Sequence, residues 1–394
     1  MRRWEWVALA AIAALAAGLF LWELSDVGYA NTYYTAAAQA AGQSWHAFFF
    51  GALDAGSFIT VDKPPMGVWP MGLSVRLFGL SAWSVLAPQA LMGIAAVLVL
   101  FDVVRRSFGT LTGLLAALMF ALTPVAVLMF RFNNPDALLT LLLIGAAWGL
   151  VRALESGQTR WLVLSAVLVG CGFNTKFLQA WIVLPGFALT YLLAGAPRLL
   201  VRIRQLTITA AAVIVSSGWW MFVVDLIPPD QRPYIGGGGT NLVRDLALGY
   251  DGLGRVFGQR VGPQNVLQVV GGSGAQQPPG PGGGPGSGGA PDLFRMFNDE
   301  FAGEASWLLP FALVSLLALL VATRRVARTD RVRGGLLVWG GWLLTHAVVF
   351  SLSRGIIHPY YAVALAPGSV ALAAAGIVGL GSRAPSTGAA RFAL

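Results

Sequence analysis

The sequence predicts an all-α integral membrane protein, a helix bundle with about ten transmembrane helices. The chain of 394 residues is 56% hydrophobic and only 11% charged, whereas soluble domains carry about 25% charged residues. Its mean hydropathy is +0.70. Apolar runs long enough to cross a bilayer recur along the chain, and arginines gather between them. A chain of this composition folds in lipid, because a bilayer span needs about 20 mostly apolar residues.

Ten apolar runs account for the predicted helices. The first follows Met1, Arg2 and Arg3, and nine further runs come after it, so we expect an uncleaved anchor and not a signal peptide. Residues 67–80 are apolar but short and contain Arg76, so we expect them to lie along the membrane interface without crossing. The runs cover residues 6–24, 82–104, 109–130, 136–153, 160–174, 177–195, 206–226, 305–323, 334–352 and 360–381.

Arginine supplies most of the net charge of +9, because only two of the 26 basic residues are lysine. If the N-terminus is cytoplasmic, the dense arginine clusters fall in cytoplasmic connections, as the positive-inside rule requires. Charge that marks orientation predicts a lipid bilayer as partner and no nucleic acid. The clusters contain Arg105, Arg106, Arg152, Arg160, Arg198, Arg202, Arg204, Arg324, Arg325, Arg328, Arg331, Arg333, Arg383 and Arg391.

Cysteine and histidine are scarce. Cys171 is the single cysteine, which excludes an internal disulfide, and it lies in an apolar run where a buried hydrophobic role is expected. With three histidines in the chain, a dedicated zinc centre is not expected.

The connections on the outer side contain both lysines, most of the Asp and Asn residues, and two of the three histidines. They divide the chain into a membrane module (1–226, with an outer loop at 25–81), an outer Gly/Pro-rich loop (227–304, partly disordered), C-terminal helices (305–381) and a cytoplasmic tail (382–394). The composition of residues 236–291 predicts a mobile loop that buries no core. A Gly-rich phosphate loop would need a GK[ST] ending, which this tract lacks.

Asp62, Lys63, Pro64 and Pro65 form the most informative outer motif. Lysine is a point charge for phosphate oxygens, and proline limits the backbone freedom that binding would have to remove. The pattern favours a site for a phosphate-bearing ligand at the membrane boundary. A solvated turn without a specific ligand is the alternative.

Further polar groups come from other connections on the same side. Asn133, Asn134 and Asp136 fit an ordinary helix start around Pro135, but polar groups in a bilayer are expensive where apolar ones would serve. Lys176 follows Asn174 in a short break between two runs and could equally extend its amine to the interface. The remaining candidates for substrate binding are Arg232, Tyr234, Arg354, His358, Tyr360 and Tyr361.

Taken in order, these motifs resemble glycosyltransferase family 39, whose members have the GT-C fold and are similar to the lipid A aminoarabinose transferase and the protein O-mannosyltransferases. The motifs that carry the resemblance are Asp62-Lys-Pro-Pro65 with Trp69, Asn134-Pro-Asp-Ala-Leu-Leu139, Asn174-Thr-Lys176, Ser217-Gly-Trp-Trp220 and His358-Pro-Tyr-Tyr361. The resemblance covers the chain to about residue 380.

The resemblance implies a multi-pass enzyme of the bacterial plasma membrane with its active site on the extracytoplasmic face. Such an enzyme moves a sugar, with inversion, from a polyprenyl-phosphate donor to an acceptor glycan, lipid or protein. Mannose, glucose and arabinose all stay open as the sugar. In the family an Asp-Glu pair usually opens the first outer loop and supplies the base, but Asn31 and Thr32 stand in that region here.

Asp54 is therefore the first candidate for the base and Asp62 the second. Lys63, Lys176 and Arg354 are expected to surround the phosphate, with Asn134 and Asp136 ordering the site from below. No cofactor is predicted with certainty. A divalent metal that bridges Asp62 or His358 to the phosphate stays open, but no ligand spacing demands it.

A transporter or a lipid-handling protein without transferase activity is the alternative function. A transporter predicts ionisable residues in the middle of spans and two related halves. Asp102 and Asp225 lie near the ends of runs, and no repeat is visible. The outward gathering of acids and lysines favours the transferase.

Overall fold

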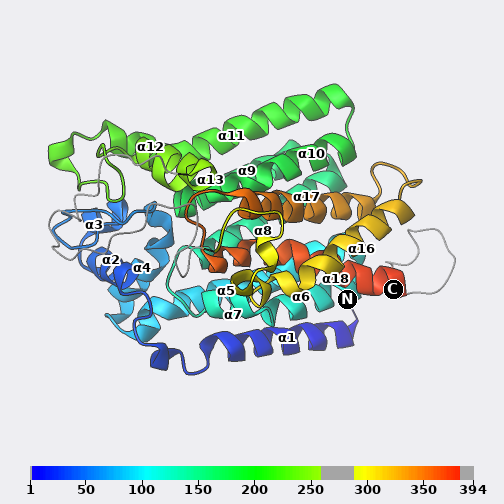
Figure 1. Cartoon of the computed structure of the whole chain (residues 1–394), viewed down its shortest axis with the longest axis horizontal. Coiled ribbons are helices and arrows are strands. Elements are labelled where there is room, and N and C mark those ends of the chain that lie inside the picture. Colours follow the sequence, from blue (N-terminus) through cyan, green and yellow to red (C-terminus); the bar gives the residue numbers. More distant parts are fainter. Residues whose placement is uncertain (1, 259–287, 382–394) are drawn as a thin grey trace.

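The computed structural model describes residues 2–258 and 288–381, and within these ranges the chain is a bundle of helices without strands. The long helices run along the longest axis of the molecule, with the start of α1 and the end of α18 at the same end of the bundle (Figure 1). The short helices α2, α3, α4 and α12 cap the opposite end. The predicted all-α membrane architecture is confirmed. The tail at 382–394 lies outside the described residues.

The long helices coincide with the predicted runs. Six helical segments, including a continuous one at Thr159–Ala194, are long and apolar enough to cross a membrane. The others are shorter, so the number of crossings stays a prediction. The bundle contains α1 (Arg3–Leu21), α5 (Ala82–Phe108), α6 (Thr110–Ala121), α7 (Pro124–Met129), α8 (Asp136–Ser156), α9 (Thr159–Lys176), α10 (Leu184–Ala194), α11 (Leu199–Leu226), α16 (Leu309–Ala322), α17 (Arg331–Leu352) and α18 (Ala366–Gly381).

The core of the bundle is closely packed. Trp339 and Trp342 of α17 are completely buried within it. Gly186 of α10 lies against Gly341 of α17, where an added Cβ would come within 2.7 Å of the facing backbone. Small residues permit such close helix contacts in membranes. By contrast, α11 leaves apolar side chains such as Leu200 exposed, as expected of a helix that faces lipid.

The cap consists of two parts of the chain, the segment between α1 and α5 and the segment that follows α11. The first part contains η1 (Leu24–Val27), α2 (Thr32–Gln43), α3 (Trp45–Phe50), η2 (Pro65–Gly67) and α4 (Trp69–Phe78). A helix of ten residues is about 15 Å long, half the thickness of the hydrocarbon core, so α4 fits the expected interfacial segment. Trp220 of α11 anchors this cap by donating its indole N–H to the Phe49 carbonyl at 3.0 Å.

Two connections differ from the sequence expectation. Residues 174–176 form the last turn of α9, and η3 (Phe177–Val183) follows without an intervening loop. The segment after α11 is also more ordered than its glycines suggest, because it forms η4 (Pro229–Gln231), α12 (Val243–Asp245), η5 (Leu246–Leu253) and α13 (Gly254–Phe257). Val243, Leu246 and Ala247 are buried in the main core. The predicted mobile loop therefore does not begin at 236, and most of the Gly/Pro tract lies outside the described residues.

The described chain resumes before α16 with three short helices, η6 (Arg295–Phe297), α15 (Asp299–Ala302) and η7 (Ser306–Leu308). Between α17 and α18 lies one more, η8 (Pro359–Ala364). The connections α10–α11 and α16–α17, which contain arginine clusters, lie at the end of the bundle where α1 starts and α18 ends (Figure 1). The cap and the arginine clusters therefore occupy opposite ends, as the positive-inside argument predicts.

Candidate active site

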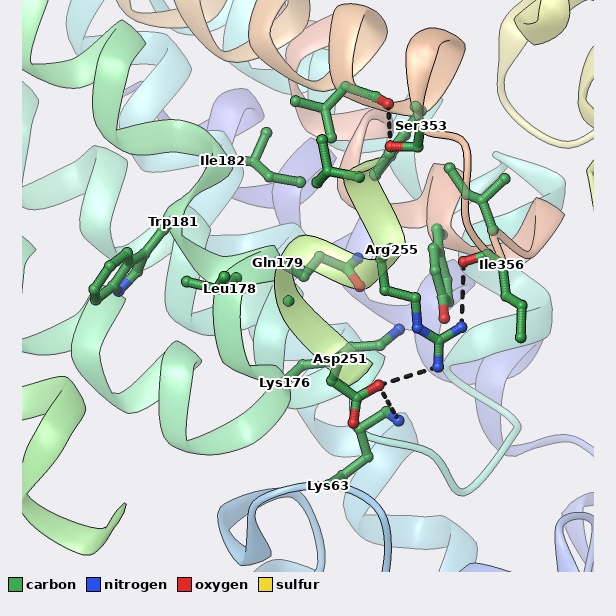
Figure 2. Close-up of a pocket in the computed structure, with 16 residues that line it drawn as sticks. Lys63, Lys176, Leu178, Gln179, Trp181, Ile182, Asp251, Arg255, Ser353 and Ile356 are labelled. Atoms are coloured by element: carbon green, nitrogen blue, oxygen red, sulfur yellow. Dashed lines mark hydrogen bonds and ion pairs between the residues drawn. The ribbon is translucent and has the colours of Figure 1, made fainter. Parts of the chain in front are cut away.

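A cavity of about 240 Å³ lies between the cap and the bundle. Its polar wall is built by Lys63, Lys176, Asp251 and Arg255, from four separate elements or connections. In Figure 2 these four side chains gather at one end of the cavity, away from Ile182. The rest of the wall is mainly apolar and includes Leu178, Trp181, Ile182, Val256, Val349, Phe350, Ile356 and Ile357. The cavity therefore suits a ligand with a charged head and an apolar body.

Lys63 stands between two carboxylates. Its Nζ lies 2.7 Å from Asp62 Oδ2 and 2.8 Å from Asp251 Oδ1. Burial alone would lower the pKa of Lys63, but the charges of Asp251 and Asp62 outweigh it and raise that pKa above its ordinary value. Asp62 is 27% exposed whereas Asp251 is 5% exposed. Lys63 therefore stays protonated, and it pairs with one carboxylate at the outer surface and one in the interior of the site.

Arg255 completes this network. One turn of helix separates it from Asp251, and its Nη2 lies 3.0 Å from Asp251 Oδ1. Its Nη1 donates to the Ile356 carbonyl at 3.2 Å (Figure 2). The guanidinium is therefore held between η5 and the segment after α17, with its charge at the polar end of the cavity.

Lys176 makes the most deeply buried ion pair of the site. Its Nζ lies 2.7 Å from both carboxylate oxygens of Asp136, and the two side chains are 5% and 0% exposed. The ammonium also lies 3.9 Å from the ring centroid of Tyr361 and 5.3 Å from that of Tyr360. Cation–π contact of this kind stabilises a buried ammonium. The pair links α9 to the start of α8 beneath the cavity.

Local geometry directs Lys176 into the site. Phe177, the next residue, has a φ of 46°, a strained value for a residue with a side chain. Asn174 fixes the preceding turn by donating to the carbonyls of Gly170 and Ser216 at 2.9 and 2.8 Å. The motif at 174–176 therefore ends a helix, clamps it to α11 and places one cation.

The side chains of Asn133 and Asn134 form hydrogen bonds with main-chain groups. The Asn133 side chain exchanges hydrogen bonds with the main chain of Asn31 at 2.8 and 2.9 Å, and donates to Thr35 Oγ1 at 2.8 Å. Asn134 Oδ1 accepts from the Asp136 N–H at 2.9 Å, as a helix start requires. Asn133 thus ties the cap to the bundle, and Asn134 orients Asp136.

Replacing Asn133 by alanine should destabilise the protein by about 1–3 kcal/mol, because a buried amide and its partners lose their hydrogen bonds. Thermal unfolding in detergent measures the effect. Gln39 is exposed on α2, so Gln39→Ala is the control and should leave the unfolding temperature unchanged. Equal unfolding temperatures for Asn133→Ala and the wild type would contradict this role.

Asp54 lies apart from the cavity wall. Its Oδ2 accepts from the Phe58 N–H at 3.0 Å, and Ser57 N–H donates to the Asp54 carbonyl at 3.0 Å. The carboxylate therefore closes its own turn in the loop before Asp62. Of the two carboxylates proposed as the base, the structure brings Asp62 to the cavity's cations and leaves Asp54 in the surface loop.

Arg232 and Tyr234 organise the second part of the cap. The Arg232 guanidinium donates to the Ile227 carbonyl and to both oxygens of Asn241. The main chain of Tyr234 pairs with Phe58 and Thr60 at 3.0 and 2.9 Å. These contacts join the segment after α11 to the outer loop, close to but outside the cavity wall.

Three more of the predicted binding residues do not line the cavity. They are Arg354, His358 and Tyr360. Arg354 is exposed, and its N–H donates to the Val256 carbonyl at 2.9 Å. The His358 ring stacks on Tyr360 with centroids 5.2 Å apart and meets Tyr361 edge-on at 5.6 Å. The aromatic group therefore packs together beside Lys176, and Tyr361 is its member on the cavity wall.

Sequence reasoning missed Asp251, Arg255 and Gln179. The first two stand four residues apart, which places them on one helix face, but the surrounding glycines predicted a mobile loop. Gln179 lay inside an apolar run and gave no signal of its own. Within residues 2–258 and 288–381 no three His, Cys, Asp or Glu side chains are grouped to hold a metal ion.

Comparisons with known proteins agree with the motif resemblance. The family model described as dolichyl-phosphate-mannose-protein mannosyltransferase matches residues 62–221. The Bacillus subtilis protein named "Putative mannosyltransferase YkcB" is 35% identical over 89% of this chain and 58% of its own length. "Putative mannosyltransferase YycA" of the same organism is 35% identical over 94% and 63%. The chain thus spans about three-fifths of the length of these relatives.

The fold has a solved counterpart. The crystal structure of ArnT from Cupriavidus metallidurans bound to undecaprenyl phosphate covers 95% of this chain and 60% of the ArnT chain, with a TM-score of 0.60 and 19% identity. At this identity the likeness concerns the fold. It confirms the fold that the motif resemblance predicts.

Proposed function

We propose that this chain is a membrane glycosyltransferase of the GT-C type, like the proteins to which it is similar, and that it transfers a sugar from a polyprenyl-phosphate carrier to an extracytoplasmic acceptor. The cavity carries the proposal, because it joins an apolar wall to an end with three cations, Lys63, Lys176 and Arg255. A polyprenyl phosphate has the matching parts, an apolar chain and an anionic head. The names of the relatives make mannose the first sugar to test, before glucose and arabinose.

The cations would hold the phosphate of the carrier. Hydrogen bonds between charged partners are the strong ones. All three cations are paired with Asp62, Asp136 or Asp251 in the structure, so an arriving phosphate has to take over part of these contacts. Lys63 is the best placed to exchange, since Asp62 is its most exposed partner. That exchange would release the Asp62 carboxylate toward the outer side.

The reaction then follows from this arrangement. The acceptor hydroxyl gives its proton to Asp62, and its oxygen forms a bond to the anomeric carbon. The bond from that carbon to the phosphate oxygen breaks, and the electron pair leaves with polyprenyl phosphate, whose charge Lys63, Lys176 and Arg255 stabilise. Attack opposite to the leaving phosphate inverts the anomeric centre. A general base contributes typically 10²–10⁴ in rate.

The orientation of the bundle gives the proposed location. With the arginine-rich end in the cytoplasm, the cap and the cavity face the outer side of a bacterial plasma membrane. The acceptor would be a cell-envelope glycan, a lipid or a protein that approaches the exposed side of Asp62.

The purified chain in proteoliposomes tests the proposal. Polyprenyl-phosphate mannose labelled in the sugar is supplied with an envelope fraction as acceptor, and parallel reactions use the glucose and arabinose carriers. We expect free carrier to be released, and label to reach the acceptor, only when the acceptor fraction is present. Entry of label into the vesicles without release of carrier would instead identify a transporter and overturn the proposal.

A further inference from the structure

Two buried polar atoms on the cavity wall have no hydrogen-bond partner in the structure. They are Asp251 Oδ2, an acceptor, and Gln179 Nε2, a donor. The Asp251 side chain is 5% exposed. In the view of Figure 2 the two side chains lie on either side of the Lys176 amine. A buried polar atom without a partner is costly and rare in native structures, so the pair indicates a polar ligand at this point.

The chemistry of the two atoms restricts that ligand. A carboxylate oxygen needs a donor and an amide N–H needs an acceptor, and a hydroxyl group can be either. An ionised phosphate offers no proton to Asp251, and a hydrocarbon chain satisfies neither atom. A neutral ligand with several hydroxyl groups satisfies both.

The position of Asp251 favours the sugar of the donor over the sugar of an acceptor. Its other oxygen, Oδ1, contacts Lys63 at 2.8 Å and Arg255 at 3.0 Å, the cations proposed to hold phosphate. The donor sugar is bonded directly to that phosphate, so its hydroxyls must lie next to the phosphate site. An acceptor would enter by the exposed side of Asp62 instead.

We infer that Gln179 and Asp251 form the subsite that binds the hydroxyl groups of the donor sugar, with Gln179 as a residue that determines sugar specificity. This inference rests on the proposed function and deepens it. Asp251 has a second role, because it also forms ion pairs with Lys63 and Arg255. The Gln179 side chain is uncharged, so it can be changed without removing an ion pair from these cations.

The test compares binding of bare polyprenyl phosphate with binding of its mannose, glucose and arabinose derivatives to the detergent-solubilised chain. The wild type should bind one sugar-linked carrier more tightly than the bare carrier. Gln179→Leu should weaken that preferred carrier about tenfold, the effect of losing one hydrogen bond, and leave bare carrier within twofold. Its unfolding temperature without ligand should stay equal or rise, because a buried donor without a partner is removed.

Ile182→Ala is the matched control on the same helix, because Ile182 also lines the cavity but offers no polar atom. It should weaken bare and sugar-linked carriers by the same factor. Equal effects of Gln179→Leu on bare and sugar-linked carrier would overturn the subsite. So would a Gln179→Leu variant that changes only the KM for acceptor, which would assign the atoms to the acceptor. A wild type that binds no carrier at all would instead refute the proposed function itself.

Discussion

Lys176→Met should both destabilise the protein and lower the rate of sugar transfer. The substitution leaves Asp136 completely buried without its counter-charge. Breaking a buried pair by removing one partner costs about 3–5 kcal/mol. Loss of a cation that stabilises the leaving phosphate should lower kcat by about 10²–10³ as well. Thermal unfolding in detergent and the proteoliposome assay measure the two effects separately.

The double variant Asp136→Asn/Lys176→Met separates folding from chemistry. It removes both charges, so most of the lost stability should return while kcat stays about 10²–10³ below that of the wild type. Arg105→Met is the control for an ion pair of another kind, because Arg105 is 33% exposed and its partner Asp102 keeps Arg106. That variant should change stability by less than about 1 kcal/mol. Full transfer by the double variant would show that Lys176 serves the fold alone.

The sequence predicted the bundle and its polar end well, for a physical reason. Apolar runs and arginine clusters report on the bilayer directly, since each residue is sorted by its own cost of burial in lipid. The same reasoning places Lys63, Asp136 and Lys176 on one side of the membrane. These three residues do meet around one cavity, or directly beneath it.

Side-chain partners could not be predicted in the same way. Asn133 and Arg232 are polar groups at the membrane boundary, and only the path of the chain decides whether they bind backbone or ligand. Asp251 and Arg255 are far from the motifs in sequence and lie among glycines. Their placement depends on the packing of Val243 and its neighbours against the core, which composition does not reveal.

Asp54 and Asp62 illustrate the limit most clearly. Both are carboxylates in the same outer loop, and sequence offers no means of telling which one reaches the cations. The turn after Asp54 directs its carboxylate to the Phe58 N–H. Asp62 instead precedes Lys63 and the rigid Pro64-Pro65 pair, and its carboxylate contacts the lysine. The order of the two candidates is therefore reversed in the proposed mechanism.

Asp62→Asn should reduce kcat by about 10²–10⁴ while the KM for the carrier changes little. The amide has nearly the shape of the carboxylate but cannot accept the proton of the acceptor hydroxyl. Lys63 keeps its contact with Asp251 at 2.8 Å, so the phosphate site should persist. A fall in kcat without a rise in KM is the signature of an interaction made only in the transition state.

Asp54→Asn is the matched control in the same loop and should keep kcat within about threefold, because a turn-closing hydrogen bond contributes only about 0.5–1.5 kcal/mol to stability and none to the reaction. Unfolding temperatures of both variants show whether the loop has stayed folded. If Asp54→Asn loses transfer and Asp62→Asn retains it, Asp54 is the base and the loop must rearrange when the carrier binds. If both variants retain full transfer, the base is a third group, and Asp251 is the carboxylate that the cavity then offers.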